Sequence, residues 1–170
     1  DVTLPEYLKM IEYKTAVLVG AALKMGAVVA NASESNCNKI YDFGRDLGIA
    51  FQLQDDYLDA FGDPKTFGKQ VGGDIIENKK TFLYLTALEK LDPAHSIQLS
   101  HLYSINPQDP SGKIETVKQL FIESGAAEAI QNEIELYTNK ALSTLEELEV
   151  KGEKKQILRE FAQALMRRKV

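Results

Sequence analysis

The clearest chemistry in the sequence belongs to three aspartates, Asp55, Asp56 and Asp59, which lie in an otherwise apolar, helix-forming segment. Residues four apart share one face of a helix, so Asp55 and Asp59 point the same way, and Asp56 is displaced by about 100°. Three like charges this close are unfavourable unless a cation or a solvated surface compensates them. The C-terminal end of a helix adds to that cost through its dipole. The pattern therefore favours a hard divalent cation such as Mg2+.

A set of lysines follows the aspartates and supplies the opposite charge. These lysines are Lys65, Lys69, Lys79 and Lys80. Mg2+ is usually held by one or two carboxylates together with substrate phosphates, and lysine is a common ligand for phosphate oxygens. The combination indicates a magnesium-diphosphate site. An acidic helix end beside a solvated lysine loop is the simpler alternative, and the apolar neighbours of the aspartates count against it.

The composition is that of a soluble globular protein. The 170 residues are 44% hydrophobic and 26% charged, which is enough for a core, and we expect a single domain over 1–170. The net charge of −5 argues against a nucleic-acid partner. The one cysteine, Cys37, permits no internal disulfide and favours a reducing, cytoplasmic compartment. No signal peptide is recognisable, and the most apolar window, 16–32, is interrupted by Lys24 and is short for a membrane span.

The spacing of apolar residues predicts helices along the whole chain and no strand. The expected helices cover 5–31, 35–61, 78–91 or 79–91, 93–105, 111–123, 126–150 and 153–166. A loop over 62–77 follows the aspartates, and we expect Gly152 to end the helix that begins at residue 126. Lys14 interrupts the apolar face of the first helix, where it either extends to solvent or points at an anion.

Four separated pieces of the sequence resemble the second aspartate-rich region of the trans-isoprenyl diphosphate synthases, which include farnesyl, geranylgeranyl and longer polyprenyl diphosphate synthases. The pieces are Phe51-Gln-x-x-Asp55-Asp56-x-x-Asp59, Gly62-Asp63, Gly68-Lys69 and Asp74-Ile-x-x-Asn78-Lys79. The resemblance covers nearly the whole chain but only the C-terminal half of the family fold. It implies an all-α helical bundle around a deep apolar cavity, here without the N-terminal helices.

The resemblance also implies a reaction. An allylic diphosphate ionises to a carbocation, the double bond of isopentenyl diphosphate attacks that cation, and a proton is then lost. In this family pattern, Asp55 would bind magnesium directly. Asp56 and Asp59 would support the metal, largely through bound water or from outside its immediate coordination.

Further roles follow from the same resemblance. Lys14-Thr15 falls where the family has a Lys-Thr pair, one helix before the aspartates. Lys14, Lys69 and Lys79 would bind the allylic diphosphate, and Gln52 would lie alongside the site. Thr15 would line the region where the allylic chain begins.

The basic tail, Arg167-Arg168-Lys169, resembles the C-terminus that in some family members closes over isopentenyl diphosphate. Surface charge is the alternative interpretation of this tail. Family members are commonly homodimers, and we expect the same of the parent protein.

The sequence departs from the family pattern in one large respect. Asp55-Asp56-Tyr-Leu-Asp59 is the only Asp-Asp-x-x-Asp in it, whereas the family has a second, earlier motif. We therefore expect this chain to be truncated, inactive alone, and apolar on the exposed face of its early helices. A non-catalytic subunit or relative of such a synthase stays open, as does another magnesium-diphosphate enzyme such as a terpene cyclase. The lysine-rich loop fits chain elongation better than cyclisation.

Overall fold

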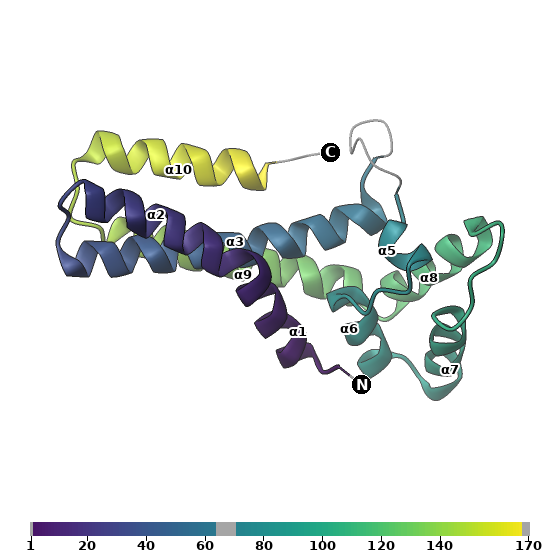
Figure 1. Ribbon diagram of the computed structural model, residues 1–170. Coiled ribbons are helices and arrows are strands. Elements are labelled where there is room, and N and C mark those ends of the chain that lie inside the picture. The colour runs from purple at the N-terminus through teal and green to yellow at the C-terminus, as the bar shows by residue number, and fades with distance from the viewer. Residues whose placement is uncertain (1, 64–70, 168–170) are drawn as a thin grey trace. The chain divides into compact units, whose positions relative to one another are not determined.

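The computed structural model describes residues 2–63 and 71–167 (Figure 1). Within these ranges the chain is helical and contains no strand, so the all-α prediction is confirmed. The elements are α1 (Leu4–Ile11), η1 (Glu12–Ala16), α2 (Val17–Val29), α3 (Glu34–Phe61), α5 (Gly73–Ile76), α6 (Phe82–Lys90), α7 (Pro93–Leu102), α8 (Ser111–Glu123), α9 (Ala126–Glu146) and α10 (Gly152–Met166). None of the helices in the described part of the chain combines the length and the apolar character that crossing a membrane requires.

The chain forms two compact units, and each is assembled from separate stretches of sequence. The bundle unit contains Leu8–Gln52 and Glu133–Arg168. The loop unit is built mainly from Leu53–Asn132, together with Tyr7 and the residues before it. The boundaries between the units fall inside α1, α3 and α9, and not in linkers. The expectation of a single domain stays a prediction.

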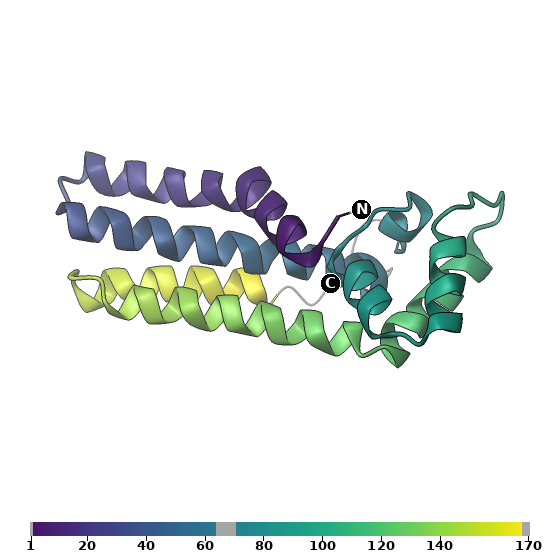
Figure 2. The ribbon, with the colours of Figure 1, turned by 90° about the horizontal axis from the view of Figure 1, so that it is seen from below.

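The bundle unit packs four helical segments side by side, from α2, α3, α9 and α10 (Figure 2). Their apolar side chains recur at three- and four-residue spacing, so each helix has one stripe to bury. One buried cluster of this unit contains Ile40, Phe43, Leu47, Ala141, Leu145, Leu148 and Ala162. This core fixes the first part of α3, which carries Gln52 at its end.

Small residues bring the first helical stretch and α3 unusually close together. A Cβ built on Gly48 of α3 would lie 2.7 Å from the Cα of Ala16. A Cβ on Gly44 would lie 2.9 Å from the Cα of Gly20, and one on Gly20 would lie 2.8 Å from the carbonyl oxygen of Tyr41. Backbone atoms at these distances leave no room for a side chain, so glycine is required at the crossing.

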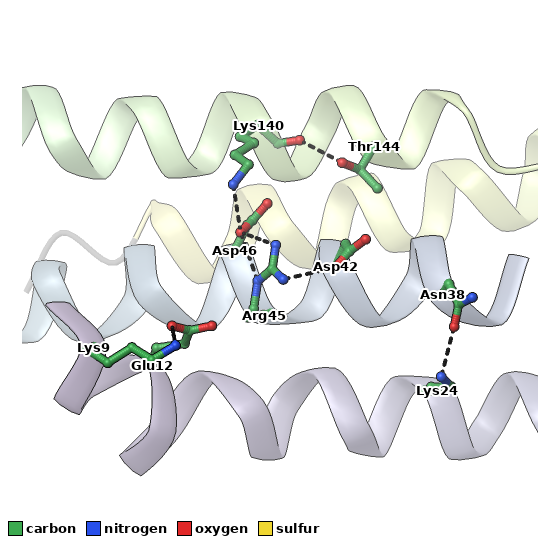
Figure 3. Close-up of polar contacts among 9 residues, drawn as sticks. All are labelled: Lys9, Glu12, Lys24, Asn38, Asp42, Arg45, Asp46, Lys140 and Thr144. Atoms are coloured by element: carbon green, nitrogen blue, oxygen red, sulfur yellow. Dashed lines mark hydrogen bonds and ion pairs between the residues drawn. The ribbon is translucent and has the colours of Figure 1, made fainter. Parts of the chain in front are cut away.

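A buried carboxylate interrupts the apolar interior of the bundle unit. Asp46 of α3 is 1% exposed and accepts hydrogen bonds from Arg45 Nε at 3.3 Å and from Lys140 Nζ of α9 at 3.4 Å (Figure 3). Arg45 also pairs with Asp42 at 3.0 Å. Two cations therefore compensate a charge that would otherwise be costly to bury.

In the loop unit, α6 is the central helix. Its residues from Phe82 to Ala87 are all buried, so its whole circumference faces other protein. The next helix, α7, begins as the sequence predicted: Asp92 accepts from the N–H of Ala94 at 2.9 Å, and Pro93 takes the first helical position. Gly125, with φ of 73°, separates α8 from α9.

Several expectations about element boundaries were wrong. The helix expected over 93–105 ends at Leu102. The segment 62–77 is not loop throughout, because Gly73–Ile76 forms the short helix α5. The following helix begins at Phe82 and not at residue 78 or 79, because Asn78 is left-handed and Thr81 is extended. Helix α9 ends at Glu146, well before Gly152, and Gly152 is instead the first residue of α10.

The early helices carry an exposed apolar face, as the sequence suggested. Leu18, Met25, Val28 and Val29 of α2 are between 56% and 83% exposed. Several of them line a groove of about 500 Å³ beside Tyr41. Exposed apolar patches of this kind often mark contact surfaces.

Candidate functional site

Asp59 connects the end of α3 to the turn that contains α5. Its Oδ2 accepts a hydrogen bond from the N–H of Asp74 at 2.9 Å, and its backbone carbonyl accepts from the N–H of Gly72 at 2.6 Å. A Cβ on Gly73 would lie 3.1 Å from Asp59 Oδ1, so the backbone of the turn approaches this carboxylate closely. The aspartate helix end and the α5 turn are therefore one polar assembly within the loop unit.

The ionised form of Asp59 is disfavoured by its surroundings. Burial raises its pKa to about 6, and the charges of Asp74 and Asp55 act in the same direction. The N–H of Asp74 and the ammonium of Lys79 oppose the shift. The contribution of Asp55 agrees with the prediction that positions 55 and 59 share a face of the helix. A cation bound here would relieve both the burial and the repulsion.

Asp56 turns to a different side of α3, as its position in the helix requires. It is 6% exposed, and its Oδ2 accepts a hydrogen bond from the hydroxyl of Tyr7. Burial raises the pKa of Tyr7 far above its ordinary range, and the neighbouring charge of Asp56 adds to the shift. Asp56 is thus held by the protein, whereas Asp55 and Asp59 are only half-buried.

The α5 turn brings an acid and a lysine together beside Asp59. Lys79 Nζ lies 2.8 Å from Asp74 Oδ1 and 2.8 Å from Glu77 Oε2. Hydrogen bonds to these two carboxylates raise the pKa of Lys79, which therefore stays protonated at neutral pH. The Lys79 side chain is about half exposed, so its ion pairs are weak and an incoming anion can compete for the ammonium.

The bundle unit contains the other described residues that the resemblance selects. The hydroxyl of Thr15 donates to Gln52 Oε1 at 3.1 Å, so these two side chains are in contact. Lys14 is exposed. Both Lys14 and Thr15 lie in η1, a π-helical turn inside an otherwise α-helical stretch. Such turns are rare and frequent at functional sites.

Part of the predicted site lies outside the described residues. Lys65, Lys69, Arg168 and Lys169 belong to the two stretches that the structure does not describe. Arg167 is exposed just after α10. The roles expected of these residues stay predictions.

Sequence reasoning missed three residues that shape this region. Tyr7 lies 49 positions before its partner Asp56, and Asp74 was noted only as part of a motif. Lys113 of α8 donates to Asn78 across 35 positions, and nothing in its local sequence predicts a buried lysine. Periodicity could place each residue on a helix, but it could not pair residues so far apart.

The donor set fits a hard cation that binds by oxygen and retains water. Among the described residues, no three acidic, histidine or cysteine side chains gather closely enough to enclose a metal ion. The carboxylates of Asp55 and Asp59 nevertheless share one helix face. Burial raises the pKa of Asp59, and a bound cation would offset the cost of ionising this carboxyl. Mg2+ typically binds in this way, through one or two carboxylates, waters and substrate phosphates.

Comparison with known proteins places this arrangement in context. The sequence profile of the polyprenyl synthetase family matches residues 1–121. A geranylfarnesyl diphosphate synthase of Natronomonas pharaonis is 34% identical over 170 residues, which are 99% of this chain and 47% of that protein. This chain therefore spans about half the length of the relatives it matches, which agrees with the expectation that it corresponds to half of the family fold.

This chain also matches about half the length of the solved chains that resemble it. A crystal structure of a geranylgeranyl pyrophosphate synthase has a TM-score of 0.92 and 50% identity, covering 100% of this chain and 53% of that one. A geranylgeranyl pyrophosphate synthase of Corynebacterium glutamicum, complexed with isoprenyl diphosphate and magnesium, has a TM-score of 0.90 and 28% identity. That match covers 99% of this chain and 48% of the other.

Proposed function

Because the chain belongs to the polyprenyl synthetase family, we propose that it carries the second aspartate-rich site of a magnesium-dependent trans-prenyltransferase. The reaction joins an allylic diphosphate to isopentenyl diphosphate and releases diphosphate. One observation carries the proposal: Asp59 is hydrogen-bonded to Asp74, and Asp74 is ion-paired with Lys79. Carboxylates suited to a metal and an ammonium suited to phosphate thus belong to one network. The chain spans about half of its relatives, so turnover is proposed for it together with the remaining half of the fold.

The aspartates are the proposed metal ligands. On the family pattern, Asp55 would bind Mg2+ directly, and Asp56 and Asp59 would support the metal, largely through bound water or from outside its immediate coordination. When bound, Mg2+ neutralises charge that develops on the departing diphosphate. The contact with Tyr7 holds Asp56 in place, and the N–H of Asp74 orients Asp59.

The diphosphate is bound by lysines. We assign this role to Lys14, Lys69 and Lys79, on the family pattern. Lys79 is available because its ion pairs are exposed and weak. The hydrogen bond between Thr15 and Gln52 holds the two side chains together. On the family pattern, Thr15 would line the start of the allylic chain and Gln52 would lie alongside the site. Apolar helix packing keeps water from the carbocation, which would otherwise be captured by solvent.

Other parts of the proposal depend on the family pattern alone. Arg167, Arg168 and Lys169 would close over isopentenyl diphosphate. The parent protein would be a homodimer in the cytoplasm, and the exposed face of α2 is one surface available for contacts.

Elongation of labelled substrate tests the proposal. The chain is mixed with a polypeptide covering the part of the Natronomonas pharaonis synthase that it does not match, and with farnesyl diphosphate, Mg2+ and radiolabelled isopentenyl diphosphate. We expect label that acid treatment makes extractable into organic solvent, as allylic diphosphates are acid-labile and isopentenyl diphosphate is not, only when both polypeptides and Mg2+ are present. The same mixture with Asp55→Asn is the control and should lose the label. Equal incorporation by the Asp55→Asn mixture would contradict the assigned role of the aspartates.

A further inference from the structure

Two left-handed residues bracket the short helix α5. Gly72, with φ of 84°, precedes it, and Asn78, with φ of 55°, follows it. At the second end, the N–H of Asn78 donates to the carbonyl of Ile75 at 3.2 Å, and the N–H of Lys79 donates to the carbonyl of Asp74 at 2.9 Å. This pair of bonds is a Schellman motif, in which a left-handed residue ends a helix. The conformation of Asn78 therefore sets the direction in which Lys79 leaves the turn.

The side chain of Asn78 is held at both ends of its amide. Its Oδ1 accepts from Lys113 Nζ at 2.5 Å, and its Nδ2 donates to Asn106 Oδ1 at 2.8 Å. Asparagine tolerates the left-handed conformation better than most residues but less readily than glycine. The two side-chain bonds stabilise a backbone conformation that the residue alone does not require.

Lys113 is an unusual residue to find inside a protein. It is 4% exposed, and its Nζ also donates to the carbonyl oxygen of Ile105 at 3.0 Å. Within the described ranges it forms no ion pair with a carboxylate, and burial lowers its pKa. Burying an ammonium against neutral oxygens is costly. A methionine would fill similar space without that cost, so the hydrogen bonds of Lys113 serve more than packing.

The start of α8 contacts both left-handed residues. Lys113 reaches Asn78 after α5, and its neighbour Ile114 lies against Gly72 before α5. A Cβ built on Gly72 would be 3.0 Å from a side-chain carbon of Ile114. Consecutive residues of one helix therefore support both ends of the turn that carries Asp74.

We propose that Lys113 is a positioning residue for anion binding: by holding the side chain of Asn78, it keeps Lys79 oriented toward a diphosphate ligand. The proposal rests on the proposed function, because diphosphate is the ligand whose binding it supports. Lys113 acts through Asn78 and does not itself contact the ligand.

The first test measures binding of inorganic diphosphate in the presence of Mg2+ by isothermal titration calorimetry. Lys113→Met should weaken diphosphate binding about tenfold. This is the order of effect expected when the hydrogen bond from the charged Lys113 to Asn78 is lost and Lys79 is no longer oriented. Lys90→Met, an exposed lysine of α6, is the matched control and should bind as the wild type does. Lys113→Met with wild-type affinity would overturn the proposal.

The second test asks whether Lys113 acts through Asn78. Glycine adopts the left-handed conformation without a side-chain anchor, so Lys113→Met should weaken binding much less in an Asn78→Gly background. If Lys113 had a purely structural role, Lys113→Met would lower the melting temperature equally in the wild-type and Asn78→Gly backgrounds. Its effect on diphosphate affinity would then be the same in both backgrounds. An equal loss of affinity in the two backgrounds would also overturn the proposal.

A milder variant covers the case in which Lys113→Met does not fold. Asn106→Ala removes the other anchor of Asn78 at an exposed position, and should weaken diphosphate binding by a smaller factor. Wild-type affinity in Asn106→Ala would then count against the proposal.

If the wild type binds no diphosphate, the proposed function is contradicted. Urea unfolding of Lys113→Met, Asn78→Gly and the double variant still tests whether Lys113 acts on the turn through Asn78. Additive losses of unfolding free energy would show that the two residues are not coupled and would overturn the proposal.

Discussion

The bundle unit and the α5 turn hold their site residues by different physical means. In the bundle unit, Thr15 meets Gln52 because glycines let two helices approach until backbone atoms touch at Gly48. In the α5 turn, Asp59 and Lys79 are joined through Asp74 by hydrogen bonds and an ion pair. The first arrangement relies on van der Waals packing, and the second relies on polar contacts and left-handed backbone.

The difference predicts where each region is vulnerable. Close packing gives no space to an added methyl group, because backbone atoms cannot turn aside as the end of a side chain can. Polar contacts near the surface tolerate changes of shape but respond to pH and to bound ions. The following experiments compare the two regions, beginning with the largest expected effect.

Gly48→Ala should destabilise the protein by about 1–3 kcal/mol, because the new methyl group would meet the backbone of Ala16. Gly26→Ala is the matched control: nothing lies within 4 Å of its Cβ, and removing a helical glycine should stabilise by about 0.5–1 kcal/mol. Urea unfolding measures both. Stabilisation by Gly48→Ala, as by Gly26→Ala, would show that the two helices are not as close at the crossing as described.

Thr15→Val keeps the shape of the side chain and removes its hydrogen bond to Gln52. We expect a loss of about 0.5–1.5 kcal/mol in unfolding free energy. Thr138→Val is the control, because that hydroxyl donates to the carbonyl of Ile134 in its own helix, and its loss should cost less. A larger loss of unfolding free energy for Thr138→Val than for Thr15→Val would argue that the hydrogen bond between Thr15 and Gln52 adds nothing to stability.

Asp59→Asn should stabilise the metal-free protein at neutral pH. The pKa of Asp59 is about 6 in the folded protein and 3.8 ordinarily, so the folded state favours the protonated carboxyl. Wild-type stability attributable to this group is present below pH 3.8 and is lost as pH rises through 6. The melting-temperature advantage of Asp59→Asn should therefore be greatest above about pH 7 and should shrink toward a constant below about pH 4. Glu89→Gln, an exposed carboxyl on α6, serves as control. A variant less stable than the wild type at pH 8 would contradict the burial argument.

Glu77→Gln should have the smallest effect on stability, within about 1 kcal/mol, because the pair with Lys79 is exposed. It should also strengthen diphosphate binding by up to about fivefold, since one competitor for the lysine is removed and a negative charge is lost. Calorimetric titration with Mg2+ present measures the change. Weaker binding would mean that Glu77 orients Lys79 rather than competing for it.

The sequence predicted most of the fold because its signals are local. The helix over 35–61 and the break before Pro93 follow from periodicity and capping, and both are observed. The carboxylates on one face of α3 were predicted for the same reason. The α5 turn was missed because Asn78 adopts a left-handed conformation that is stabilised by Lys113, 35 residues away. The partner of Asp56 was missed because Tyr7 lies even further away in sequence.

Calorimetric titration of inorganic diphosphate into the wild-type chain, with and without Mg2+, tests the central claim most directly. The claim is that the end of α3 and the α5 turn together form one magnesium-diphosphate site. We predict that diphosphate binding requires Mg2+, is abolished by Asp55→Asn and is weakened by Lys79→Met. Diphosphate bound equally well by Asp55→Asn, or without Mg2+, would contradict the claim.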